Sequence, residues 1–306
     1  DSFTANNNIV ADCAFDYNGT KGIIVWTNST ASGGNNYVIY YPNNDTITEP
    51  RSFVDASIIE NTPQLYPSPY DDTIIAIMGQ SSSIPETRAL VYHSIADVWD
   101  NQTLMLAGGV NNITSSIVKA ATCAWESNTR LARCFVWNNR SNLSVFTYNY
   151  TWSATLNYTI QTQNNISSGK RNIESVSVPY SNEIILLGEN GTSLSGFRWN
   201  GTEIDLETSL SNVTQTYATP THIDLDIRYV TDNSSTIEVL AVFGNSSTTA
   251  ISTFSTTYNG TSFSTPTSSN TGSVGVTVSN IRMASNINGY TGGNNYWAIV
   301  ITLNGG

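Results

Sequence analysis

Charged residues are scarce in this chain of 306 residues. They make up 11% of the sequence, against about 25% in typical soluble proteins. Lys and Arg total 12 and Asp and Glu total 23, so the formal net charge is −11 and the pI is near 4.4. Neutralising the phosphates of a nucleic acid needs clustered basic side chains. The charge balance therefore predicts no nucleic-acid partner, and something other than charge must keep the chain in solution.

The motifs of metal and nucleophile chemistry are also missing. The sequence has no HExxH, CxxC or DxDxDG pattern and no GxSxG, so no metal or other cofactor and no catalytic residue is predicted. The two histidines, His93 and His222, stand in unrelated segments and are interpreted as structural side chains.

No apolar run approaches the about 20 residues that a membrane helix needs, so no membrane span is predicted. There is no signal peptide at the start. We interpret this as removal on secretion, or as numbering from the mature end.

Only three cysteines occur. Cys123 and Cys134 lie eleven residues apart across a polar stretch centred on Asn128 and Thr129, so on a hairpin they would face each other within reach of a disulfide. Cys13 is left over. We expect it to be a small buried side chain, with a link to another subunit as the alternative.

What the chain does have is an internal repeat. An apolar run followed at once by a polar turn recurs six times, starting at Ile23, Ile74, Cys134, Ile184, Val239 and Ala298. Each unit also holds further short apolar segments bounded by Asn, Gly and Ser, and helical periodicity is nearly absent. A period of about 40 to 50 residues with four strands each is typical of propeller blades. The sequence predicts an all-β, six-bladed β-propeller.

The repeats predict a single domain over 1–306. Their approximate ranges are 9–55, 56–114, 115–170, 171–215, 216–272, and 273–306 plus 1–8. The last repeat stops after its second strand, which predicts an incomplete blade. Three explanations stay open: a blade closed with the N-terminal strand but one strand short, a chain cut from a longer protein, or a strand from a neighbouring molecule.

Asn-x-Ser/Thr triplets are unusually frequent. With 36 Asn and 77 Ser and Thr, random order would give about nine such triplets, whereas sixteen occur without an intervening proline. We interpret them as N-glycosylation sites on an extracellular or cell-surface protein, with glycans supplying the hydration that charges normally supply. They are Asn18, Asn28, Asn44, Asn101, Asn112, Asn139, Asn142, Asn149, Asn157, Asn165, Asn190, Asn200, Asn212, Asn233, Asn245 and Asn259.

These triplets follow the repeat and predict two rings of glycans. One ring would follow the second strand of each repeat (Asn28, Asn139, Asn190, Asn245), and the other would follow the third (Asn44, Asn101, Asn149, Asn200, Asn259). The alternative is that the triplets collect in turns because Asn, Ser, Thr and Gly do. That explains their location but not their excess.

The segments GFRWNGTEIDLETS and TFSTTYNGTSFSTPT look like blade hairpins of secreted β-propellers, and length and repeat period are similar to those of six-bladed fungal fucose-binding lectins. The regular Arg, Glu and Trp placement of those lectins is not found in every repeat. The resemblance therefore implies a fold and carries over no binding residue.

From these features we expect a non-enzymatic structural or adhesive glycoprotein, a subunit of a cell-surface coat or filament. Its partners would be N-linked glycans, copies of itself in a polymer or other surface glycoproteins. The alternative is a carbohydrate-binding lectin, whose aromatic side chains would stack on sugar rings. A second alternative is a propeller glycosidase using paired acids. Its candidates are Asp71 with Asp72, Asp224 with Asp226, and Glu203 with Asp205.

Overall fold

The computed structural model describes fifteen stretches of the chain, and they contain strands and turns but no helix. The stretches are 11–27, 35–52, 60–80, 86–100, 104–107, 121–137, 142–159, 173–189, 194–209, 220–229, 237–245, 250–265, 267–273, 277–285 and 297–304. No helix that could span a membrane occurs in them.

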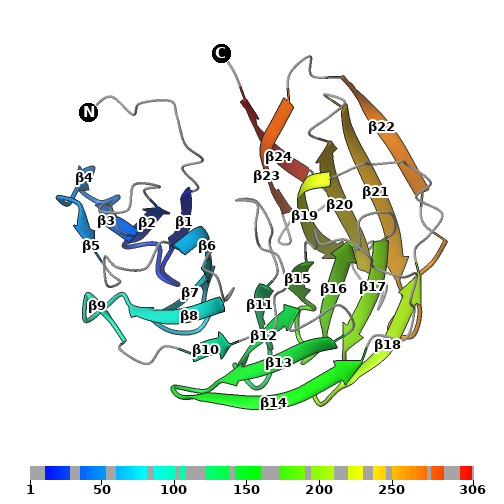
Figure 1. Cartoon of the computed structure of the whole chain (residues 1–306), viewed down its shortest axis with the longest axis horizontal. Helices are drawn as coiled ribbons and strands as arrows, with labels where there is room; N and C mark the ends of the chain where they lie inside the picture. The colour runs from blue at the N-terminus through cyan, green and yellow to red at the C-terminus, as the bar shows by residue number, and fades with distance from the viewer. Residues whose placement is uncertain are drawn as a thin grey trace. The chain divides into compact units, whose positions relative to one another are not determined.

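The strands form six antiparallel sheets that follow one another along the chain (Figure 1). In the first sheet, β1 (Ala11–Phe15), β2 (Gly22–Thr27) and β3 (Asn35–Tyr41) are consecutive neighbours, and β4 (Thr46–Ile47) and β5 (Arg51–Ser52) both pair with β3. The second sheet repeats this plan with β6 (Glu60–Pro67), β7 (Thr73–Gln80), β8 (Glu86–His93), β9 (Val98–Trp99) and β10 (Leu104–Ala107). In both sheets the fourth position is filled by two short strands.

The next three sheets are regular four-stranded meanders. The third contains β11 (Ala121–Trp125), β12 (Ala132–Trp137), β13 (Asn142–Tyr148) and β14 (Trp152–Thr159). The fourth contains β15 (Ile173–Ser177), β16 (Ile184–Glu189), β17 (Leu194–Trp199) and β18 (Ile204–Ser209). The fifth contains β19 (Pro220–Tyr229), β20 (Ile237–Asn245), β21 (Ala250–Tyr258) and β22 (Thr267–Ser273).

The sixth sheet has two strands in the part of the chain that the structure describes, β23 (Thr277–Ser285) and β24 (Trp297–Asn304). The sequence predicts this shortfall after the second strand. The three explanations for the missing strands stay predictions.

The chain divides into two compact units. One comprises Asp1–Trp125 with Arg130–Asn157, and the other comprises Glu126–Thr129 with Tyr158–Gly306. A single domain over 1–306 stays a prediction.

Strand alternation explains how the sheets of the first unit pack together. Successive side chains point to opposite faces, so Ile23 and Val25 of β2 share a face with Tyr37 and Ile39 of β3. That face packs against the second sheet in a core cluster that includes Leu65, Ile74, Ala76 and Tyr92. A second cluster joins Ile75, Ile77, Ala89 and Val91 to Ala121, Cys123, Trp125, Ala132, Cys134 and Val136 of the third sheet. Both faces of the second sheet are therefore buried in core clusters.

The same alternation overturns one expectation. Ala14 packs against the first cluster, so its neighbours Cys13 and Phe15 point to the opposite face of β1. Cys13 is exposed, and the expectation of a buried side chain is wrong. A role for Cys13 in linking subunits stays a prediction.

Candidate functional site

The turns at one end of the sheets form part of the surface of both units. In a meander, the turn from the first to the second strand and the turn from the third to the fourth lie at the same end. Both kinds are described for several sheets. Their side chains bond mostly to one another and to the neighbouring sheet.

The turn after the third strand is the same motif in four sheets. Its middle residue has positive φ in each case: 53° at Asp45, 57° at Tyr150, 100° at Gly201 and 89° at Gly260. The triplets are Asn44-Asp45-Thr46, Asn149-Tyr150-Thr151, Asn200-Gly201-Thr202 and Asn259-Gly260-Thr261. All four are Asn-x-Thr and are predicted glycosylation triplets. The described turn between β8 and β9 also has positive φ, 55° at Asp97, but reads Ala96-Asp97-Val98 and is no triplet.

Hydrogen bonds show why Asn and Thr recur at this spacing. The Thr hydroxyl donates to the Asn Oδ1 at 2.7 Å in the Asn44 turn and at 2.8 Å in the Asn200 and Asn259 turns. In the last two turns, the backbone N–H groups two and three residues further on also donate to the same Oδ1, at 2.9 to 3.0 Å. A side chain that bonds its own backbone two residues on builds the turn directly. The triplet therefore has a structural use that does not depend on a glycan.

The structure places the sixteen predicted glycosylation sites unequally. Asn18, Asn44, Asn149 and Asn259 are exposed and Asn200 is half-buried. Asn142, Asn157 and Asn245 lie in strands, with side chains outside the described part. Asn28, Asn101, Asn112, Asn139, Asn165, Asn190, Asn212 and Asn233 lie outside the described residues. The ring predicted after the second strand is thus not placed by the structure.

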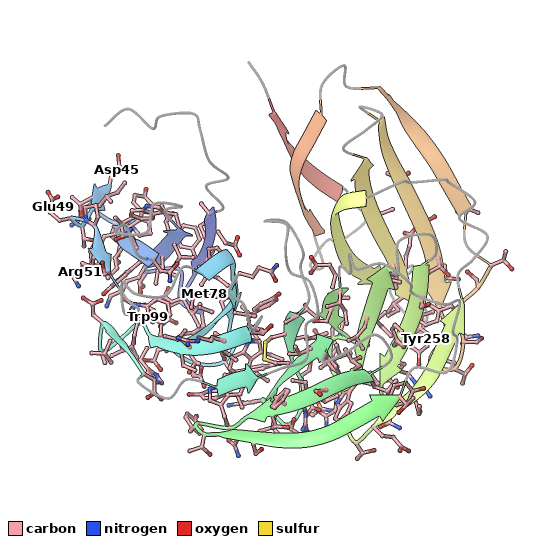
Figure 2. All side chains as sticks on the ribbon, in the orientation of Figure 1. Asp45, Glu49, Arg51, Met78, Trp99 and Tyr258 are labelled. Atoms are coloured by element: carbon pink, nitrogen blue, oxygen red, sulfur yellow. A yellow bond between two sulfur atoms is a disulfide. The ribbon has the colours of Figure 1, made fainter. Side chains whose placement is uncertain are left out.

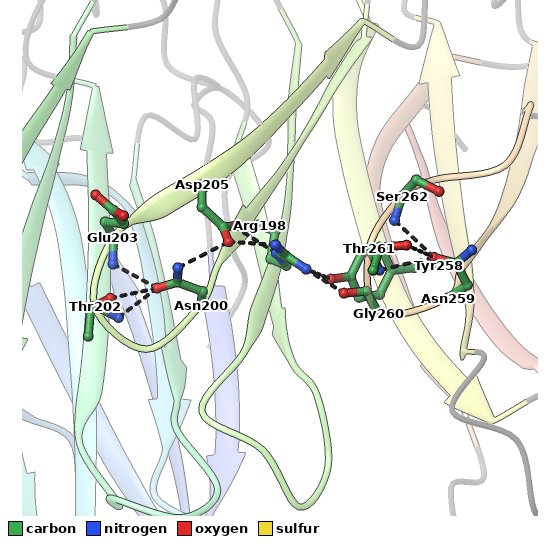
Figure 3. A network of polar contacts seen from close by, with 10 residues as sticks. All are labelled: Arg198, Asn200, Thr202, Glu203, Asp205, Tyr258, Asn259, Gly260, Thr261 and Ser262. Carbon is green, nitrogen blue, oxygen red and sulfur yellow. Dashed lines mark hydrogen bonds and ion pairs between the residues drawn. The ribbon is translucent and has the colours of Figure 1, made fainter.

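Arg198 on β17 forms an extensive polar cluster among the described residues of the second unit (Figure 3). Its Nε donates to Oδ1 of Asp205 at 2.7 Å, and its Nη2 donates to Oδ2 of the same carboxylate. Its Nη1 donates to the Tyr258 hydroxyl at the end of β21 and to the carbonyl of Gly260 in the next turn. Arg198 therefore links the fourth sheet to the fifth.

This cluster has little capacity left for a ligand. A guanidinium group has five N–H donors, and four hydrogen bonds are already made within the protein. Asp205 also accepts from Nδ2 of Asn200 at 3.0 Å. Arg198 and Asp205 have side chains only 15% and 25% exposed. The arrangement is suited to holding two sheets in register, and a bidentate pair of this kind fixes geometry as well as charge.

The electrostatics of the cluster follow from the same contacts. Hydrogen bonds from Arg198 lower the pKa of Asp205 below its ordinary value, although partial burial opposes the shift. Burial raises the pKa of Tyr258 and of the neighbouring Glu183. The Asp205 carboxylate that pairs with Arg198 is therefore ionised near neutral pH.

A carboxylate with a lowered folded-state pKa stabilises the fold above its unfolded-state pKa, and the contribution is lost as pH falls through the folded-state value. We expect Asp205→Asn to lower the thermal unfolding midpoint at pH 7, with the gap to the unmodified chain closing below about pH 4. Thermal unfolding followed by circular dichroism across pH measures this gap. Glu203→Gln, in the exposed part of the same turn, is the control and should change little. A gap that is unchanged at about pH 2 would contradict the assignment.

The first unit has an analogous link between its first two sheets. Arg51 pairs with Asp97 at 2.9 Å, and Asp97 also accepts from the Tyr92 hydroxyl at 2.9 Å. Tyr37 and Tyr92 pack against Trp99, with ring centroids 5.7 and 5.1 Å apart. Arg51 and Trp99 are labelled in Figure 2. Aromatic burial here serves packing between sheets.

Trp199 forms a buried link in the second unit. Its side chain is 0% exposed, and its Nε1 donates at 2.7 Å to Oε1 of Glu126, which is also 0% exposed. Thr129 donates to the other oxygen of Glu126. A buried carboxylate is tolerated only with such donors. The contact joins β17 to the turn after β11.

The acids considered for glycosidase chemistry are engaged in turns where they are described. Asp71 accepts from the backbone N–H of Thr73 and Asp72 accepts from that of Ile95, at 3.0 and 3.3 Å. Asp205 is bound by Arg198, and Glu203 is exposed. Asp224 and Asp226 lie on β19 with side chains outside the described part.

Of the two histidines, His93 ends β8, whereas the side chain of His222 is not described. Within the described residues no group of His, Cys, Asp or Glu could hold a metal ion.

The structure joins Cys123 and Cys134 in a disulfide (yellow in Figure 2). The two residues are direct partners on β11 and β12, with Cα atoms 4.1 Å apart. Both side chains are 2% exposed and belong to the core between the second and third sheets.

No protein-family model and no curated sequence matches the chain. Solved structures do. The lectin AofleA from Arthrobotrys oligospora matches with a TM-score of 0.58 at 12% identity, covering 97% of this chain and 80% of the lectin. The Aleuria aurantia lectin, solved with Fucα1-6GlcNAc, matches with a TM-score of 0.52 at 9% identity, covering 97% of this chain and 88% of the lectin. Both are fungal propeller lectins.

The chain has a six-bladed β-propeller fold. Each sheet described above is a blade, and the links at Arg51, Arg198 and Trp199 are contacts between neighbouring blades. The expected fold class is confirmed, and so is the likeness to fungal propeller lectins. These contacts between blades cannot be predicted from the sequence, because the spacing of Arg198 and Tyr258 does not indicate that they interact.

Proposed function

We propose that this β-propeller is a non-enzymatic carbohydrate-binding protein with a preference for neutral glycans. The observation that carries the proposal is the match to two propeller lectins over 97% of the chain. Because the match covers most of each lectin as well, it concerns the whole propeller and not a shared fragment. It favours the lectin alternative over the coat or filament subunit that the sequence suggested first.

Charge supports the preference for neutral sugars. With a net charge of −11, the chain repels sialylated or sulfated glycans at long range. Neutral sugars are recognised by hydroxyl hydrogen bonds and by aromatic faces, and Tyr alone contributes 16 residues.

A glycan array tests the proposal. We expect the purified chain to bind one or more neutral structures, fucosylated ones among them, and to bind sialylated and sulfated versions of the same cores more weakly. Heat-unfolded protein on the same array controls for adhesion through exposed apolar side chains. Silence across a broad array, or binding confined to anionic glycans, would overturn the proposal.

We also propose that the chain is an extracellular glycoprotein. The excess of Asn-x-Ser/Thr triplets and the Cys123–Cys134 disulfide support this compartment, since disulfides persist in oxidising surroundings. Among the described triplets, glycans are expected only on asparagines whose side chains are exposed to water.

Among the described sites we expect glycans on the exposed Asn18, Asn44, Asn149 and Asn259. The measurement is peptide mapping by mass spectrometry of protein secreted from a eukaryotic host, after enzymatic deglycosylation in heavy-oxygen water. Asn128 is also exposed but stands in Asn-Thr-Arg, so it should stay unmodified. Four bare asparagines in secreted protein would mean that the triplets serve the turns alone.

A further inference from the structure

Tyr180 is the most exposed large hydrophobic side chain of the described residues, at 87%. It lies in the turn between β15 and β16, where its φ is 60°. Pro179 precedes it, and proline followed by positive φ is the pattern of a type II turn, whose third position usually holds Gly or Asn. A bulky residue rarely adopts this conformation. Positive φ also occurs at Tyr150 and Arg130 in other turns of this chain, so the backbone conformation belongs to the turn, whereas the 87% exposure of the Tyr180 ring is not needed for packing.

The turn that carries Tyr180 is held rigidly by the turn of the preceding blade. The backbone N–H of Ser127 donates to the Ser181 carbonyl at 2.9 Å. The backbone N–H groups of Asn128 and Thr129 donate to Oδ1 of Asn182 at 3.1 and 3.0 Å. All these residues belong to the second unit. The tyrosine therefore projects from a fixed base, which reduces the entropy lost on binding.

Hydrogen-bonding capacity remains on two asparagines of these paired turns. Asn128 is exposed and its Nδ2 donates to the Tyr180 carbonyl at 3.4 Å, which leaves its Oδ1 as an acceptor. Asn182 uses only its Oδ1, so within the described part of the chain its Nδ2 is available as a donor. An exposed aromatic face with an amide acceptor and an amide donor in the same pair of turns matches the chemistry of a sugar ring, which offers an apolar face and hydroxyl groups.

A second Pro-Tyr turn in the same chain holds a tyrosine whose ring face is covered by another side chain of the protein. Tyr70 follows Pro69 in the turn between β6 and β7, without positive φ. The Arg130 guanidinium carbon lies over its ring, 5.4 Å from the centroid. Tyr70 therefore has a cation on its face, whereas the same position in the later blade presents an open ring.

We propose that Tyr180, with Asn128 and Asn182, forms a contact site for a neutral sugar ring. The proposal rests on the carbohydrate-binding function proposed above and assigns part of that binding to this turn. The tyrosine supplies the stacking face, and the two amides orient the sugar hydroxyls.

The test compares Tyr180→Gly, Tyr180→Phe and Tyr70→Ala with the unmodified chain on neutral glycans, by array and by concentration series on the strongest binder. Glycine suits the positive φ, so Tyr180→Gly should melt at an equal or higher temperature while binding at least about tenfold more weakly. Tyr180→Phe keeps the ring and should stay within about threefold. Tyr70→Ala should bind as the unmodified chain does.

The outcomes separate the two proposals. If the unmodified chain binds neutral glycans and Tyr180→Gly binds them equally well, the Tyr180 site is wrong and the carbohydrate-binding function stands. The site is also wrong if Tyr70→Ala loses as much affinity as Tyr180→Gly while both remain folded. If the unmodified chain binds no glycan, both proposals fall.

Discussion

Trp199→Ala is expected to lower the free energy of unfolding by about 3 to 5 kcal/mol, the usual cost of deleting a buried tryptophan. The side chain is fully buried and joins the fourth blade to the turn that holds Glu126. Its loss leaves a cavity and takes a donor from a buried carboxylate. Guanidinium unfolding measures the change, since the midpoint falls while the slope stays constant for a pure stability effect.

Phenylalanine at the same position separates packing from hydrogen bonding. Trp199→Phe keeps most of the ring but removes the N–H, so we expect a loss of about 1 to 3 kcal/mol from the unsatisfied carboxylate. Trp152→Phe is the matched control, because Nε1 of Trp152 is buried without a hydrogen-bond partner in the described part of the chain. That variant should lose less. Equal losses in the two Trp→Phe variants would show that the bond to Glu126 contributes nothing.

Removal of the disulfide is the other large effect that we expect. Cys123→Ala with Cys134→Ala opens a short loop, since the cysteines are 11 residues apart, and the entropy of a loop of this size corresponds to about 3 kcal/mol. The bond also lies in the core shared by the second and third blades. Guanidinium unfolding of the double variant measures the loss.

Cys13→Ser is the matched control for this experiment. Cys13 is exposed, so its replacement should change stability by less than about 0.5 kcal/mol. If the double variant were as stable as Cys13→Ser, the disulfide would not contribute to the fold.

Strand pattern and turn chemistry were enough to predict the fold from the sequence. The apolar runs beginning at Ile23, Ile74 and Ile184 are second strands of their blades, and each is followed by a third strand that pairs with it. The repeat in the sequence is visible because every blade needs the same alternation of buried and exposed positions.

The links between blades could not be predicted. Arg198 is separated from Tyr258 by 60 residues and Glu126 from Trp199 by 73. Such pairs depend on how one sheet is laid against the next, and no local rule of strand or turn formation contains that information. The same holds for Tyr180, whose exposure and backbone conformation are properties of the folded turn.

The Asn-x-Thr triplets illustrate a pattern with two physical causes. The sequence favours glycosylation because the triplets exceed the random expectation. The structure adds a second cause, since Oδ1 of Asn200 and Asn259 accepts hydrogen bonds from the Thr of each triplet and from the backbone. Selection for this turn raises the frequency of the same three residues, so an excess of triplets alone does not separate the two causes.

We expect this sparsely charged six-bladed propeller to bind neutral carbohydrate. Isothermal titration calorimetry of the purified, folded chain against neutral fucosylated, mannosylated and galactosylated oligosaccharides tests this claim most directly. Saturable heat with at least one of these oligosaccharides is the predicted result. No heat with any of them, from a sample that unfolds cooperatively on heating, would contradict it.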